Sequence, residues 1–197
     1  SLLTMMGLSI HSTSLNDRAI ANPHNHDRAT MTQAKDTSTQ KRVPLYKGWS
    51  KYHYPISTKN SQAQRYFNQG LLLSYGFNHA EAARAFQEAA NLDPNCAICY
   101  WGIALVQGPN INAGMDKDAV PTAWAALQKA MNLRQSASPR EQALIQALAK
   151  RYTQEPVQDR KPLDLAYAKA MRAVTRLYPE DLDAATLFAE ALMDTTD

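Results

Sequence analysis

From residue 61 to residue 193, apolar positions recur at the three- and four-residue spacing of amphipathic helices, without the alternation typical of strands. Polar and helix-breaking residues interrupt this pattern at regular intervals. The pattern predicts seven helices joined by short links, at residues 61–76, 78–91, 97–107, 119–134, 139–153, 162–178 and 181–193. Because short links favour antiparallel packing of consecutive helices, we expect an all-α fold made of helix pairs.

Two of these helices carry capping signals at their start. Asn78 is followed by Glu81, and Ser138 is followed by Glu141, which is the spacing at which a capping side chain and a returning carboxylate satisfy free backbone amides. Pro139 stands at the first helical position after Ser138, where its missing N–H has no cost. The sequence therefore predicts sharp starts for both helices.

Residues 1–60 have a different composition from the rest of the chain, with eight Lys or Arg against three Asp or Glu. Residues 1–42 are rich in small polar side chains and show no sustained periodicity, which is typical of a flexible basic arm. Residues 43–60 mix aromatic residues with Pro and Gly. We expect this second part to form an irregular, aromatic-rich strap that is extended over the first helices.

One internal repeat covers residues 63–96. Gly70 is followed after twelve residues by Ala82, and then by Phe86, Ala89 and Pro94. Small residues let two helices approach closely, a large one fills the gap to the next pair, and the proline turns the chain. This pattern resembles the tetratricopeptide repeat (TPR). The resemblance implies an α-solenoid of helix pairs over residues 61–197, about three and a half repeats long and therefore incomplete.

The later repeats are looser. The second repeats the small-large-small spacing after a longer turn. The third allows two registers, and the last predicted helix, 181–193, has no partner helix in sequence and an apolar side at Leu187 and Leu192. The positions concerned are Ala123, Leu127 and Ala130 in the second repeat, and either Tyr167, Met171 and Val174 or Ala166, Ala170 and Ala173 in the third.

Part of the sequence is narrower than a generic repeat. The motifs FNHAEAARAF (77–86), CAICYWG (96–102) and GPNIN (108–112) follow HYPIST (53–58). Together they resemble a group of bacterial TPR proteins. That resemblance implies binding and assembly rather than catalysis, and it favours export to the periplasm over a cytoplasmic location.

Cys96 and Cys99 form a Cys-Ala-Ile-Cys motif. Covalent haem attachment is excluded because Tyr100, not His, follows the second Cys. A thioredoxin-like pair would follow a strand, and none is predicted here. His79, the nearest candidate for a further metal ligand, begins a helix that runs away from the pair. Two small packed residues, a local disulfide, and a labile metal or redox site remain open.

A polar cluster is expected where the first repeat turns. His79 and Asn78 stand at that turn, and the end of the third helix should return Asn110 and Asn112 to the same edge. These residues form either a functional polar surface or a network that holds the long loop after residue 108. The loop does not match the calcium-binding spacing.

The first helix of each pair lines the inner face of a TPR array, which is the family's usual binding surface. The sequence places there Asn68, Leu71, Tyr75, Trp101 and Leu105. A carboxamide such as that of Asn68 suits peptide binding because it both donates and accepts hydrogen bonds. Two interpretations remain open: a groove that binds a peptide or protein partner, or a core that residues 43–60 cover.

Several classes of function are not indicated. The net charge of +3 is too small to imply nucleic-acid binding, and the apolar runs are too short to cross a membrane. No nucleophile elbow, zinc-protease motif or phosphate-binding loop is present, so neither catalysis nor a cofactor is expected. The main hypothesis is a scaffold that binds a peptide or a partner subunit. The alternatives are an exported metal- or redox-handling protein that uses Cys96 and Cys99, and a structural subunit buried in a larger complex.

Overall fold

The computed structural model describes residues 43–48 and 51–196, and the expected arm at 1–42 lies outside them. Within the described part, the only strand-like feature is an isolated bridge between Asn110 and Ala113. The helices are α1 (Ser61–Tyr75), α2 (His79–Leu92), α3 (Ala97–Leu105), α4 (Val120–Leu133), α5 (Pro139–Leu148), α6 (Lys161–Leu177) and α7 (Leu182–Met193). Two short 3₁₀ turns, Lys117–Ala119 and Arg134–Ser136, flank α4. The all-α prediction is confirmed for these residues.

Each predicted helix is present, and most ends agree within two residues. The largest difference is at α5, which ends at Leu148 rather than at residue 153. The backbone tightens there, since Arg151 N–H bonds to the carbonyl of Leu148, three residues earlier. The side chains of Arg151 and Tyr152 then turn inward and are buried. Tertiary contacts therefore end this helix before its sequence signals do.

The two predicted caps have different outcomes. Ser138 and Glu141 form a complete capping box at the start of α5, with Pro139 in the first turn. At α2 the prediction is wrong, because Asn78 makes no side-chain capping bond. The preceding residue, Phe77, has a φ of 56° and reverses the chain, and Asn78 is not in the extended conformation that caps require. Glu81 pairs with Arg84 instead.

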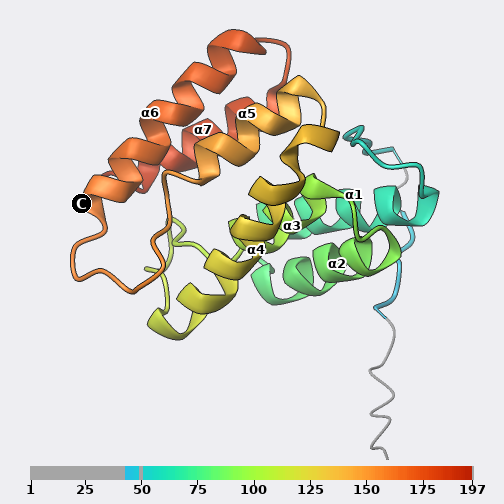
Figure 1. The fold of residues 1–197 in the computed structure, drawn as a ribbon, viewed down its shortest axis with the longest axis horizontal. Coiled ribbons are helices and arrows are strands. Elements are labelled where there is room, and N and C mark those ends of the chain that lie inside the picture. Colours follow the sequence, from blue (N-terminus) through green and yellow to red (C-terminus); the bar gives the residue numbers. More distant parts are fainter. Residues whose placement is uncertain (1–42, 49–50, 197) are drawn as a thin grey trace, which may run out of the picture. The chain divides into compact units, whose positions relative to one another are not determined.

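Consecutive helices pack against one another along the chain, most extensively α1 with α2, α3 with α4, and α6 with α7. Figure 1 shows α1, α2 and α3 lying together, α5, α6 and α7 forming a second group, and α4 between them. Phe86 of α2 is completely buried, and its ring lies over the backbone of both Gly70 and Gly102. The ring thus occupies the space that the missing side chains of these two glycines leave, and Gly70 is one of the small residues of the repeat.

The structure settles the register of the third helix pair. Of the two possible sets, α6 buries the one with the larger side chains, which is Tyr167, Met171 and Val174. The last helix, α7, packs against the preceding helix α6. Leu187 is buried in that contact, whereas Leu192 remains 37% exposed. None of the helices in the described part is both long and apolar enough to span a membrane.

Candidate functional site

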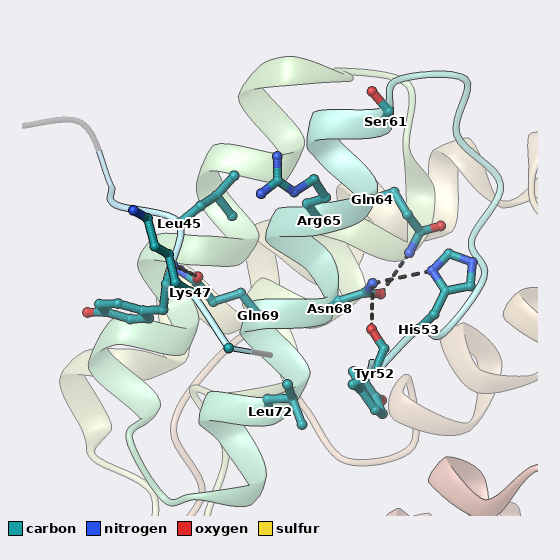
Figure 2. A pocket seen from close by; sticks show the side chains of 12 residues that line it. Leu45, Lys47, Tyr52, His53, Ser61, Gln64, Arg65, Asn68, Gln69 and Leu72 are labelled. Carbon is teal, nitrogen blue, oxygen red and sulfur yellow. Dashed lines mark hydrogen bonds between the residues drawn. The ribbon is translucent and has the colours of Figure 1, made fainter. Parts of the chain in front are cut away.

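Two carboxamide side chains on α1 hold the backbone of the strap. Gln64 and Asn68 are one helical turn apart and therefore share a face. Tyr54 donates its backbone N–H to Asn68 Oδ1 (3.3 Å), and Asn68 Nδ2 donates to the carbonyl of Tyr52 (3.3 Å). Gln64 Nε2 donates to the carbonyl of Tyr54 (2.7 Å), and Ile56 N–H donates to Gln64 Oε1 (3.0 Å). Figure 2 shows Asn68 between Gln64, Tyr52 and His53.

The bonds to the strap follow every second residue, 52, 54 and 56. This is the period of an extended chain, in which alternate residues face the same side. Each amide uses both its donor and its acceptor, so the contact depends on backbone geometry rather than on side-chain identity. This face of α1 is therefore arranged to hold an extended polypeptide.

Residues 43–48 lie on the other side of α1. The buried side chain of Gln69 accepts from the backbone N–H of Tyr46 (2.8 Å) and donates to the carbonyl of Pro44 (2.9 Å). Tyr66 donates its hydroxyl to the carbonyl of Val43 (2.7 Å). A hollow of about 670 Å³ lies between the two parts of the strap, with Arg65 on its α1 side (Figure 2).

The second wall of the strap site comes from α5. Glu141 is completely buried and accepts from both the backbone N–H (2.7 Å) and the hydroxyl of Ser57. Arg140 donates to the carbonyl of Pro55 (2.5 Å), and its guanidinium lies 4.2 Å from the centre of the Tyr54 ring. The capping carboxylate of α5 thus also fixes the end of the strap.

The third wall is the start of α7. Tyr52 and Tyr75 both donate their hydroxyls to Asp183 Oδ1 (2.5 and 2.7 Å), and Tyr54 donates to Asp181 Oδ2 (2.8 Å). Burial, followed by the neighbouring carboxylates or tyrosines, raises the pKa of these three hydroxyls far above the ordinary tyrosine value. They therefore remain neutral donors over the whole physiological range.

Of the two interpretations left open for this face, the structure contains the one in which the strap covers a core. Leu71, Trp101 and Leu105 are buried. Tyr54 is itself part of the core and stacks on Phe67, which in turn lies beside Trp101. Of the five predicted binding residues, Asn68 and Tyr75 reach the strap site. Asn68 bonds to the strap and Tyr75 bonds to α7, while the apolar three form the core beneath them.

Cys96 and Cys99 are joined by a disulfide at the start of α3, and both are completely buried. No cluster of three or more His, Cys, Asp or Glu able to hold a metal is found among the described residues. Among the interpretations left open by the sequence, the structure contains the local disulfide.

The polar cluster expected at the turn of the first repeat forms only in part. Asn110 Nδ2 lies 3.5 Å from His79 Nδ1, and Asn110 Oδ1 accepts from the backbone N–H of Asn112 (2.9 Å). Asn78 is exposed and donates its backbone N–H to Leu73. Burial, and more weakly the charge of Arg151, lowers the pKa of His79, so its imidazole is neutral near pH 7. The contacts present hold the long loop to the first repeat.

A buried charge network near this loop was not predicted. Arg151 donates to the carbonyl of Pro109 (2.8 Å) and pairs with Asp194, while Tyr152 donates to the carbonyl of Ala104 (2.7 Å). Burial raises the pKa of Asp194 to about 6, although the charge of Arg151 opposes this. No local sequence signal marks the pair, because Arg151 and Asp194 lie 43 residues apart.

Comparison of the chain with models of known protein families, with curated proteins and with solved structures finds no match in any of the three.

Proposed function

We propose that this chain is a TPR-like helical scaffold that binds an extended segment of a partner protein on its inner face and performs no catalysis. The observation that carries this proposal is the set of hydrogen bonds that the side chains of Gln64 and Asn68 make with the backbone of residues 52–56. A face that holds one extended segment through its backbone can accept another of similar shape.

The packing of consecutive helices supports the solenoid part of the proposal. Helix pairs with short links stack most simply when their members are antiparallel. The contact of Phe86 with Gly70 also fits the spacing of the TPR pattern. In this arrangement α1, α3, α5 and α7 are the first helices of successive units, and the strap bonds to three of them.

The strap occupies the inner face in this structure, so a partner segment competes with it. The strap also indicates what the partner offers: an extended backbone with aromatic hydroxyls two residues apart that reach Asp181 and Asp183. The buried disulfide lends no support to a redox function, because neither sulfur reaches the surface.

The test uses a fluorescent peptide with the sequence of residues 51–58 and the full-length chain. Tyr54→Ala weakens the internal strap and replaces no residue of α1, α5 or α7, which form the walls of the site. We expect this variant to bind the peptide at least tenfold more tightly than the wild type in fluorescence anisotropy. Adding Asn68→Ala should reduce that affinity at least tenfold. A matched peptide with Ala in place of both tyrosines serves as the control.

Two results would count against the proposal. The first is a Tyr54→Ala variant that keeps its helical circular dichroism yet binds no peptide. The second is equal binding of the native and the alanine peptides. If Tyr54→Ala unfolds the protein, the milder pair Tyr52→Phe and Tyr54→Phe keeps the rings in the core and loosens the strap through its hydroxyls alone.

A further inference from the structure

A second surface lies away from the strap, along the outer side of α6. It is a groove of about 870 Å³ formed by α6 and the end of α7. Its apolar lining is unusually exposed, with Leu165 at 51%, Leu177 at 68% and Leu192 at 37%. Exposed apolar side chains that are gathered in one groove mark an interaction site more often than scattered ones do.

Three leucines at equivalent positions of the successive helix pairs differ in how far they are exposed. Leu92, Leu133 and Leu177 occupy the same place, each six residues after the large core residue of its unit. Leu92 and Leu133 pack against the core cluster. Leu177 does not pack there, and at 68% it is more exposed than Leu165 on the same helix. An apolar position that the first two units cover is thus left open in the third.

The groove also carries a single sign of charge. Lys169, Arg172 and Arg176 line it and share one face of α6, at intervals of three and four residues. The only acidic residue of α6, Asp164, is buried and pairs with Arg160. No carboxylate lines the groove, and within the described part of the chain none of these three cations forms an ion pair.

We propose that the groove between α6 and α7 docks an amphipathic helix of another protein, with an apolar stripe and acidic residues along its margin. The apolar stripe would cover Leu165, Leu177 and Leu192, and the acidic margin would lie opposite the basic face of α6. An extended segment suits this surface less well, because no side-chain amide lines it to hold a backbone. The site is separate from the inner face, so it does not depend on the function proposed above.

The probe is a synthetic helix of about 18 residues, close to the length of α6 at about 1.5 Å per residue. It carries a leucine stripe flanked by Glu, and a matched probe carries Lys in place of each Glu. With the full-length chain, we expect the acidic probe to bind in the micromolar range and the basic probe at least tenfold more weakly. The affinity for the acidic probe should fall as salt is added.

Variants then locate the site. Arg172→Glu with Arg176→Glu should lower the affinity for the acidic probe at least tenfold, and so should Leu177→Asp. The matched control, Lys117→Glu with Lys150→Glu, reverses two charges that do not line the groove and should leave binding unchanged. Asn68→Ala should also leave it unchanged, which separates this surface from the strap site.

Three outcomes of the probe measurements would overturn the proposal. They are equal binding of the two probes, no binding of either, and an affinity that the groove variants do not alter. A concentration-dependent dimer that the groove variants abolish would also overturn it, because a second copy of this chain would then be the occupant. All variants are checked for wild-type circular dichroism and thermal unfolding before their affinities are compared.

Discussion

At the scale of single residues, Phe86 determines how closely three helices approach. Its ring is completely buried, and a Cβ built on Gly70 would lie only 2.6 Å from it. A Cβ on Gly102 would overlap the same ring from the other side. Both glycines stand inside helices, where glycine is normally unfavourable. Their presence is explained by the space the ring needs, which the repeat spacing had suggested for Gly70.

We expect Gly102→Ala to lower the free energy of unfolding by about 1–3 kcal/mol, since overpacking of a rigid core exceeds the gain in helix propensity. Urea denaturation measures the change. Gly114→Ala is the matched control, because a Cβ there meets nothing within 4 Å. A Gly102→Ala protein as stable as the wild type would show that the Phe86 ring can move aside.

The raised pKa of Asp194 leads to a prediction about how the free energy of unfolding depends on pH. Its folded-state pKa of about 6 lies above that of an unfolded aspartate, about 3.9. Between these values the folded state binds more protons than the unfolded state. The contribution of Asp194 to stability is therefore full below about pH 4 and is lost as pH rises through about 6.

Asp194→Asn should consequently flatten the decline in unfolding free energy between about pH 4 and 6, by about 3 kcal/mol at most. Urea titrations at several pH values measure the slope, and Glu155→Gln in an exposed loop is the control. Identical slopes for wild type and Asp194→Asn would contradict the raised pKa.

At the scale of elements, the helices were predictable because their signals are local. Apolar periodicity, prolines and the Ser138–Glu141 box each act within a few residues. The predictions that were wrong concern helix ends whose structure is determined by contacts that are distant in sequence or by an unusual backbone conformation. Asn78 follows a residue with positive φ, and α5 ends early because Arg151 turns inward. The strap was expected over the first helices, but its bonds to Glu141 and Asp183 span 84 and 131 residues and leave no local trace.

The disulfide gives an element-scale prediction for the start of α3. It closes a loop of four residues, for which chain entropy gives a stabilisation of about 2 kcal/mol. Cys96→Ala with Cys99→Ala should lose about that much in urea denaturation. Because both sulfurs are buried, dithiothreitol should reduce the native protein far more slowly than the unfolded protein. Rapid reduction of the native protein, followed by thiol alkylation, would instead indicate an accessible redox pair.

At the scale of the whole domain, the sequence could not distinguish a binding surface from a core. Leu71, Trp101 and Leu105 are apolar residues at helical spacing, and that pattern serves either purpose. Only the position of Tyr54 over Phe67 shows that they are covered. Asn68 was identifiable, because a carboxamide on an inner helical face has few uses other than holding a backbone.

The strap also changes how the domain should unfold. In an ordinary solenoid each repeat contacts only its neighbours, so the ends can open independently. Here the strap and α1 bond directly to the start of α7 through the hydroxyls of Tyr52, Tyr54 and Tyr75. This link bypasses the intervening helices, so we expect the first and last helices to open together.

Replacing all three tyrosines by Phe tests this coupling, because it removes the hydroxyls and keeps the rings in place. Native-state hydrogen exchange should then show α7 amides opening at least tenfold faster, with a smaller change in α2. Tyr178→Phe is the matched control, since among the described residues its hydroxyl has no hydrogen-bond partner. If α7 exchanges at the same rate in the triple variant, or if α2 and α7 accelerate equally, the hydroxyl contacts are not what joins the two ends. Selective acceleration of α7 would show that the hydroxyl contacts of the strap and α1 couple the first and last helices of the domain, so that displacing the strap, as the proposed binding of a partner segment requires, would loosen α7.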